Sequence, residues 1–359
     1  MQRMIELSRM APVGLRRPNA AATTCPRPRI NKHESAFPGL AARFRGGART
    51  FPERGSSVPV RRSIVPALRY TRAMRRVADP SLDSGLLPGG WSAQLDLGYR
   101  LLGERTVLTT RVHEGPLVVQ KSLYPEGDTV CQNVIIHPPG GIVGGDSLAV
   151  NVDAGPCTHA QLTTPGAAKC YRSSGAFARQ HIHLRAARGA VLEWLPQETI
   201  VFDASKIQLE LSIELIDDAR FLGWDVVCLG RTAAGERFDH GALRQRLTLT
   251  RDGTLVFAER ALLNGGAPLL TSPVGLQGNP VFGTFLAAAP VVTDAMLESC
   301  RQVSLVAGEG AVTRLPGVVI ARYCGASAAA ARHYFVELWR KLRPALALRA
   351  AVPPRIWAT

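Results

Sequence analysis

The chain has 359 residues, 46% of them hydrophobic, which is enough to build a sizeable core in one or two domains. Its formal net charge of +15 comes almost entirely from residues 1–80, which hold 17 Lys and Arg against 4 Asp and Glu. The remaining residues hold 26 basic and 24 acidic side chains, so the composition excludes a generally basic, nucleic-acid-binding body.

The first 73 residues have the pattern of a chain without a fold. They are rich in Arg and Pro and show no sustained period of 2 or 3.6 residues. We therefore expect a disordered basic extension at 1–73, followed by a single domain at 74–359. Three interpretations of the extension stay open: an upstream segment absent from a natural product that starts at Met74, a solvated tail, or a targeting or nucleic-acid-binding arm.

Cysteine usage and hydropathy indicate the cellular setting. The seven cysteines lie far apart and form no C-x-x-C pair, which favours a reduced, cytoplasmic protein. No apolar run approaches the roughly 18 residues that a membrane-spanning helix needs. We predict a soluble protein without a membrane partner.

From Gly90 onward the pattern is mainly β. Alternating or short apolar runs predict strands at 94–102, 106–112, 116–120, 180–184 and 190–195. Residues 246–256 predict a hairpin, because Asp252-Gly253 lies between two alternating apolar runs. Strands recur over about 190 residues without helices between them, which excludes a βαβ architecture.

Two glycine-rich runs, 137–146 and 163–173, predict shaped loops between strands. A phosphate-binding loop would end in Gly-Lys-Ser or Gly-Lys-Thr. Here Asp146 follows the glycines of the first run, and Lys169 of the second run lies between alanine and cysteine. The residues therefore argue against nucleotide binding and favour tight turns.

Helical patterns appear late in the chain. Thr293 is a plausible N-cap for a helix at 294–301, and an Ala-rich pattern predicts a second helix at 326–342 that Pro344 ends. Three large side chains, Tyr334, Leu338 and Leu342, share one face of that second helix.

The chain ends with two large apolar side chains, Ile356 and Trp357. A terminus of this kind usually docks, and the sequence leaves open whether it docks on its own body or on a partner.

Few residues have the spacing of a catalytic or metal site. His181 and His183 share a strand face and could bind a metal together, although two solvent-exposed histidines are the simpler interpretation. The acidic residues 193, 198, 203 and 225 lie in or beside apolar runs, where a carboxylate is either partnered at a core edge or lines a polar passage. No nucleophile elbow and no H-E-x-x-H helix is present, so no enzyme is visible.

In order along the chain, several spaced motifs resemble the urease accessory protein UreD family, also called UreH. These motifs are Tyr124–Asp128, His137–Asp146, Thr164–Ser173, Leu192–Glu198, Cys228–Arg231, Leu342–Pro344 and Pro354–Trp357. The resemblance runs from about Gly90 to the C-terminus. It implies a β-rich fold whose strands wind in a helical arrangement, with two helices near the C-terminus.

The resemblance also implies a role. Members of the family are not enzymes; they bind apo-urease and the accessory protein UreF, which recruits the GTPase UreG, and the assembly delivers nickel to urease. We therefore expect a scaffold with no permanent cofactor, through which nickel passes in transit. The remaining alternatives are a β-rich protein-binding module or a small-molecule hydrolase unrelated to urease.

Two sets of site residues follow as hypotheses. Weak oxygen ligands would let nickel pass without trapping it, and the expected lining of its route is Asp146, Thr163, Thr164, Glu193, Glu198 and Asp203. The expected face for UreF consists of the late helix and the tail, with Tyr334, Leu338, Trp339, Leu342, Ile356 and Trp357.

Overall fold

The computed structural model describes residues 90–358. The predicted extension at 1–73, the start at Met74 and the domain boundary between them lie outside these residues. No helix in the described part of the chain combines the length and the apolar character that crossing a membrane requires.

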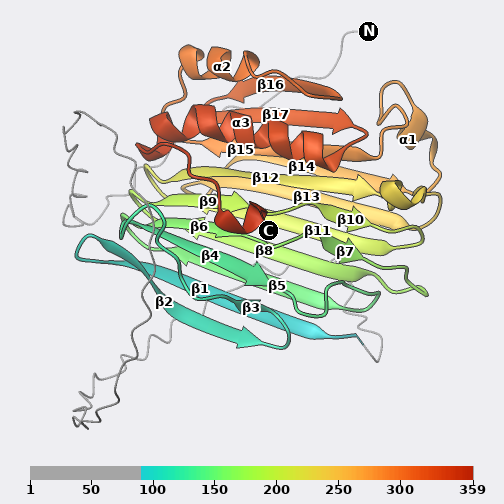
Figure 1. Ribbon diagram of the computed structural model, residues 1–359, viewed down its shortest axis with the longest axis horizontal. Helices are drawn as coiled ribbons and strands as arrows, with labels where there is room; N and C mark the ends of the chain where they lie inside the picture. Colours follow the sequence, from blue (N-terminus) through green and yellow to red (C-terminus); the bar gives the residue numbers. More distant parts are fainter. Residues whose placement is uncertain (1–89, 359) are drawn as a thin grey trace, which may run out of the picture. The chain divides into compact units, whose positions relative to one another are not determined.

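Two β-sheets form the body (Figure 1). The first sheet has seven strands in the order β14-β13-β11-β8-β5-β1-β2. Its strands are β1 (Ser92–Leu102), β2 (Arg105–Glu114), β5 (Ser147–Ala154), β8 (Ala178–Ala186), β11 (Lys206–Leu215), β13 (Ala242–Arg251) and β14 (Thr254–Asn264).

The second sheet has ten strands, eight of them in the order β16-β17-β15-β12-β9-β6-β4-β3. These are β3 (Val118–Val119), β4 (Val130–Ile136), β6 (His159–Thr163), β9 (Val191–Leu195), β12 (Arg220–Leu229), β15 (Val281–Ala288), β16 (Glu309–Leu315) and β17 (Val318–Gly325). Two short strands, β7 (Ala168–Cys170) and β10 (Thr199–Val201), extend this sheet beside β12.

Between β4 and β13 the chain winds as a coil that places strands alternately in the two sheets. Strands β4, β6, β9 and β12 pair in parallel in the second sheet. Strands β5, β8, β11 and β13 pair in parallel in the first. The prediction of a mainly β fold with a helical arrangement of strands is therefore confirmed.

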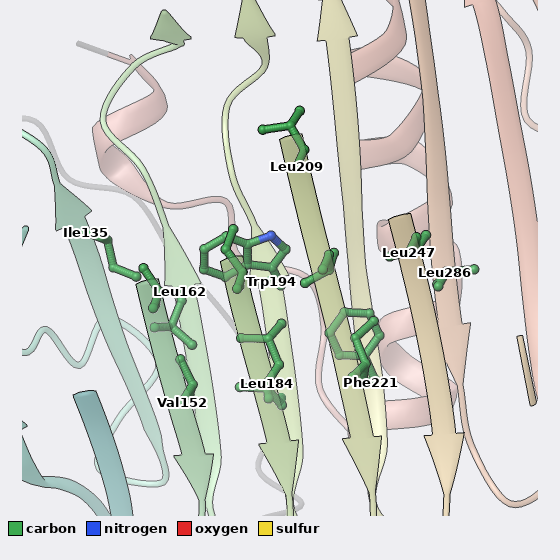
Figure 2. Packing of buried hydrophobic residues seen from close by; sticks show 14 of the residues in the cluster. Ile135, Val152, Leu162, Leu184, Trp194, Leu209, Phe221, Leu247 and Leu286 are labelled. Carbon is green, nitrogen blue, oxygen red and sulfur yellow. The ribbon is translucent and has the colours of Figure 1, made fainter. Parts of the chain in front are cut away.

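The space between the sheets holds the larger hydrophobic core. Val152, Leu184, Leu209 and Leu247 from the first sheet face Ile135, Leu162, Trp194, Phe221 and Leu286 from the second (Figure 2). Alternation along each strand produces this packing, because every second side chain points to the same face of a sheet. In β11, for example, the odd-numbered residues from 207 to 215 are buried and the even-numbered ones are not.

The predicted hairpin is confirmed. Strands β13 and β14 pair antiparallel around Asp252 and Gly253, whose φ angles are 49° and 77°. Two successive positive φ angles are what a tight turn between twisted strands requires, and the Asp-Gly pair tolerates them. The hairpin is longer than predicted, because the strands extend to Ala242 and Asn264.

Three α-helices occur in the described chain: α1 (Pro268–Thr271), α2 (Asp294–Arg301) and α3 (Ala328–Ala347). Two short 3-10 turns accompany them, η1 (Thr232–Ala234) and η2 (Arg355–Ala358). The predicted cap of α2 is confirmed, since the Thr293 hydroxyl accepts the Met296 N–H at 3.2 Å.

The prediction that Pro344 ends the second helix is wrong. Helix α3 continues through Pro344 to Ala347 and ends at Leu348, which has a φ of 57°. Proline removes one helical hydrogen bond. However, the last turn buries Leu346 and Ala347, and Arg343, just before the proline, forms ion pairs with Glu126 and Glu193. Tertiary packing therefore outweighs the local penalty.

Helix α3 covers the outer face of the second sheet, over β12, β15 and β17 (Figure 1). A second hydrophobic core forms there, with Trp224 and Phe285 of the sheet against Phe335 of the helix. Beyond the helix the chain turns back, and Trp357 packs between Trp224 and Trp339 at ring-centroid distances of 5.9 and 6.3 Å. The tail therefore docks on its own body.

Candidate functional site

A cavity of about 260 Å³ lies between the two sheets. Its walls are mostly apolar, with Leu148, Ile182 and Leu209 from the first sheet and Ile135 and Trp194 from the second. Figure 2 shows Leu209, Ile135 and Trp194 in the space between the sheets. The volume exceeds the roughly 30 Å³ that one water occupies, so the cavity can hold several waters or a hydrated ion.

Both glycine-rich loops line this cavity. His137 and Gly141 come from the first loop, and Thr164 and Lys169 from the second. The loops are joined by backbone hydrogen bonds, in which the Ile142 N–H donates to the Lys169 carbonyl at 2.8 Å. The glycine-rich runs therefore shape one end of the cavity.

Close packing explains the need for glycine in the first loop. A Cβ on Gly141 would lie 2.0 Å from the ring of Tyr171, which follows β7. Gly145 has a φ of 97°, a conformation that other residues rarely adopt. The second loop is held in turn through Thr164, whose hydroxyl accepts the Gln197 N–H at 2.9 Å.

Asp225 of β12, a partly buried carboxylate, lines the cavity from the second sheet. Its Oδ2 accepts a hydrogen bond from Gln245 Nε2 of the facing sheet at 2.7 Å. Burial raises the pKa of Asp225, and the nearby charge of Glu259 raises it further, while the hydrogen bond from Gln245 opposes them. The sequence placed Asp225 beside an apolar run but gave no sign that it faces this cavity.

Polar side chains continue from Asp225 to the edge of the sandwich. Asp225, Thr284 and Arg322 are register partners on the neighbouring strands β12, β15 and β17. From the first sheet, Glu259 accepts hydrogen bonds from the Thr284 hydroxyl at 2.8 Å and from Arg322 at 2.5 Å. A packing gap lined by Leu211, Asp225 and Thr284 adjoins the cavity, but it is too narrow to hold a water molecule.

The cavity wall also presents an unsatisfied acceptor. The side-chain oxygen of Gln180 is buried and has no hydrogen-bond partner within the described chain. Since buried polar atoms are nearly always satisfied, a guest with a hydrogen-bond donor, such as water, would complete this one. A water shell around a passing cation would supply such donors.

Of the six residues predicted to line a nickel route, Thr164 lines the cavity and the others lie elsewhere. Asp146 closes a turn, with its two oxygens accepting the N–H groups of Trp91 and Val143 at 2.9 Å each. Thr163 donates to the Leu195 carbonyl at 2.7 Å and accepts from Trp357 at 2.8 Å.

Glu193 is the centre of a buried network under α3. His159 lies 2.5 Å from its Oε1, Trp339 donates to Oε2 at 2.6 Å, and Arg343 donates to both oxygens at 3.0 and 3.1 Å. Burial alone would raise the pKa of Glu193, but the hydrogen bond and charge of His159 and the charge of Arg343 lower it to about 2. Its oxygens are therefore occupied by the chain's own donors.

The other two predicted acids brace loops. Glu198 pairs with Arg332 of α3 at 2.8 Å. Asp203 accepts the N–H groups of Asp239 and His240 at 2.9 and 2.8 Å. Burial would raise the pKa of Asp203, but these backbone hydrogen bonds and the His240 side chain lower it overall.

The predicted UreF face is also placed differently from the expectation. Tyr334, Leu338, Trp339 and Leu342 are buried under α3, so they hold the helix to the sheet and are not presented to a partner. The helical period identified the apolar face correctly, but it does not distinguish the chain's own core from an interface. Ile356 and Trp357 of the tail are half-buried.

The two histidines of β8 lie on the outer face of the first sheet. His181 is exposed, and His183 lies 3.0 Å from the Ser212 hydroxyl through Nδ1. Across residues 90–358, no three His, Cys, Asp or Glu side chains are grouped so that they could hold a metal ion.

Comparison with known proteins identifies the family to which this chain is similar. Residues 92–358 match the model of a family described as UreD urease accessory protein. The urease accessory protein UreD of Nitrosococcus oceani is 49% identical over 280 residues, which cover 78% of this chain and 94% of that protein. The UreD protein of Dechloromonas aromatica is 51% identical over 275 residues, which cover 75% of this chain and 95% of that protein.

A third relative, the UreD protein of Pseudomonas aeruginosa, is 50% identical over 270 residues, covering 75% of this chain and 95% of its own. The matched region starts beside the first described strand and includes both glycine-rich loops, the buried network and the tail. The resemblance carried by the spaced motifs is thereby confirmed, and the chain belongs to the UreD urease accessory protein family.

Proposed function

We propose that this chain is a non-enzymatic maturation factor of urease that works in the cytoplasm. In this role it binds the urease apoenzyme and UreF, and through UreF the GTPase UreG, so that nickel reaches the urease active site. The observation that carries the proposal is the family match over nearly the whole described chain. The names of the relatives, urease accessory protein, support the same role.

Within that role we propose that nickel passes between the two sheets. The cavity, the hydroxyl of Thr164 and the carboxylate of Asp225 would form the inner part of the route. Oxygen atoms suit this task because they hold a borderline divalent cation weakly, whereas a closed thiolate site would retain it.

The size of the cavity supports a hydrated ion as the travelling species. A divalent cation stripped of water in an apolar space would be very costly, so the water shell must be retained or replaced by protein oxygens. The unsatisfied Gln180 oxygen and the carboxylate of Asp225 are suitable contacts for such a shell.

Complementation tests the role directly. In a host that carries urease and the other accessory genes, we would delete the gene for this chain, restore the full chain, and measure urease activity and nickel per urease. We expect nickel-poor, inactive urease after deletion and recovery of both on restoration, with urease protein levels unchanged. Full activity without the chain would refute the proposed function.

A further inference from the structure

Two rows of side chains from the first sheet form one wall of the cavity. Each row takes one residue from each of three neighbouring parallel strands, β5, β8 and β11. The rows lie side by side on the same face of the sheet, because their members are two residues apart along each strand. They are Leu148, Gln180 and Leu209, and Val150, Ile182 and Leu211.

Gln180 is the one polar side chain in these two rows. It has a leucine as its register partner on each side. Its side-chain oxygen is buried and has no hydrogen-bond partner within residues 90–358. A buried acceptor that stays unpaired costs free energy, because it has lost its bond to bulk water without gaining another. The wall therefore offers one point of attachment in an apolar surface.

Water is a poor partner for this wall. A buried water needs about two to four polar neighbours, and the two rows supply one. Other polar groups that line the cavity lie outside the rows, among them Thr164, Glu210 and Asp225. Waters beside the rows are therefore weakly held, and replacing weakly held water with an apolar group gains affinity.

The size of the cavity and its opposite wall indicate the kind of guest. Its volume of about 260 Å³ suits a single small ring, since an apolar cavity of about 150 Å³ binds benzene and drug-sized ligands need about 300 Å³ or more. Trp194 lines the cavity from the second sheet and is 4% exposed (Figure 2). Contact with an indole favours an aromatic guest over an aliphatic one, because aromatic pairs gain energy beyond the area they bury.

We propose that the cavity binds a small uncharged aromatic molecule with one hydrogen-bond donor, of the phenol class. Its ring packs between the two rows and Trp194, and its hydroxyl donates to the side-chain oxygen of Gln180. A charged guest is disfavoured, because apolar walls do not replace the hydration that a charge loses. The consequence rests on the proposed function: a bound ring occupies the space assigned to nickel and slows its passage.

Binding of phenol and of toluene to the purified full chain tests the site without nickel or urease. The two probes are nearly the same size and differ in the hydroxyl group, so their affinity ratio reports the hydrogen bond. We expect saturable binding of both by ligand-detected NMR. In Gln180→Leu the ratio of phenol affinity to toluene affinity should fall about fivefold, because one hydrogen bond is lost.

Two variants control this experiment. Gln208→Leu makes the same change on the outer face of β11 and should leave the affinity ratio unchanged. Ala167→Trp fills the cavity from a loop and should bind neither probe. The unfolding midpoint of Gln180→Leu should stay level or rise, since an unpaired buried acceptor is removed, so a changed ratio is not the result of unfolding.

Three results would overturn the proposal. They are the absence of saturable phenol binding to the unmodified chain, binding that Ala167→Trp leaves intact, and an affinity ratio that Gln180→Leu does not change. None of them bears on the role in urease maturation, because nickel and urease are absent from the measurement.

Nickel loading of urease tests the consequence separately. At a phenol concentration equal to its dissociation constant, half of the cavities are filled, so the rate of nickel loading should fall about twofold. Bound phenol with unchanged loading would uphold the binding site and contradict the nickel route.

Discussion

Glu193 shows how a residue that was expected to carry nickel instead carries part of the fold. Its carboxylate is hydrogen-bonded to His159, Trp339 and Arg343. The guanidinium of Arg343 also donates to the two carboxylate oxygens of Glu126, at 2.7 and 2.8 Å. A buried ion pair adds little net stability, but removing one partner leaves the other charged and uncompensated. The network therefore fixes the end of α3 on β9.

Replacing Glu193 with Gln should destabilise the chain by about 3 kcal/mol at neutral pH, because Arg343 loses one of its two buried counter-charges. The pKa of Glu193 is about 2 in the folded state, below its ordinary value of 4.5. Its ionised form therefore adds stability that is complete above about pH 4.5 and is lost as the pH falls toward 2. Urea unfolding of both proteins between these pH values measures the difference.

The free-energy gap between the original chain and E193Q should shrink across that window. Glu198→Gln, at a half-buried acid with one partner, is a suitable control with a smaller effect. A gap that stayed constant down to pH 2 would contradict the assigned pKa.

Asp225 should behave in the opposite way. Burial raises its pKa above the ordinary value of 3.8, so its ionised form is disfavoured in the folded state. Asp225→Asn should therefore raise the unfolding midpoint at neutral pH, and this gain should fade as the pH drops through the raised pKa toward 3.8. Thermal unfolding from pH 7 to pH 3.5 measures it, and a midpoint below that of the original chain at pH 7 would contradict the assignment.

At the scale of elements, the tail acts as a strap over the second sheet. Trp357 packs on Trp224 and Trp339 and donates to the Thr163 hydroxyl at 2.8 Å. Arg343 also holds the strap through the carbonyl of Ala350. The element joins the end of α3 to β6.

Trp357→Ala should cost about 2 kcal/mol, less than a fully buried tryptophan, because the ring is half-buried. Trp357→Phe should cost about 1 kcal/mol, since it keeps most of the packing and loses one hydrogen bond. Urea unfolding followed by circular dichroism measures both, with Trp91→Ala, at a site 58% exposed, as a control with little effect. Equal stability of Trp357→Ala and the original chain would show that the strap is not docked in solution.

Local patterns predicted the elements well and their partners poorly. The Asp252-Gly253 turn and the Thr293 cap are determined by a few adjacent residues, and both were found where expected. The end of α3 depends on Arg343 meeting Glu126 and Glu193, which are more than 100 residues away in the chain. No local pattern reports such contacts, so the prediction that Pro344 ends the helix was wrong.

The same limit applies to the candidate site. The acids at 193, 198, 203 and 225 all lie in or beside apolar runs. The sequence does not show which of these side chains faces the cavity. A shift of one residue along a strand moves a side chain to the opposite face of the sheet. Glu193 of β9 points toward α3, whereas Asp225 of β12 points between the sheets. The glycine-rich runs were recognised as shaped loops, but their shared cavity follows only from the coil that stacks them.

At the scale of the whole molecule, the coil of alternating strands makes an interior that no single segment could enclose. Each turn of the coil adds one long strand to each sheet, and the side chains between the sheets pack into a continuous core. The cavity interrupts that core beside the glycine-rich loops, and helix α3 and the strap close the opposite face of the second sheet. We propose that nickel passes through this interior.

The measurement that tests this claim most directly is nickel per urease after maturation by a chain whose cavity is plugged. Ala167 lines the cavity from a loop, so Ala167→Trp should fill the space without disturbing a strand. Ala233→Trp, at an exposed position in η1, is the matched control. Assembly with urease and UreF would be checked for each protein by co-purification.

We expect the Ala167→Trp chain to assemble normally but to leave urease with little of its nickel, because the indole would occupy the space between the sheets. The Ala233→Trp chain should support full loading. Full nickel loading by an assembled Ala167→Trp chain would contradict a route between the sheets.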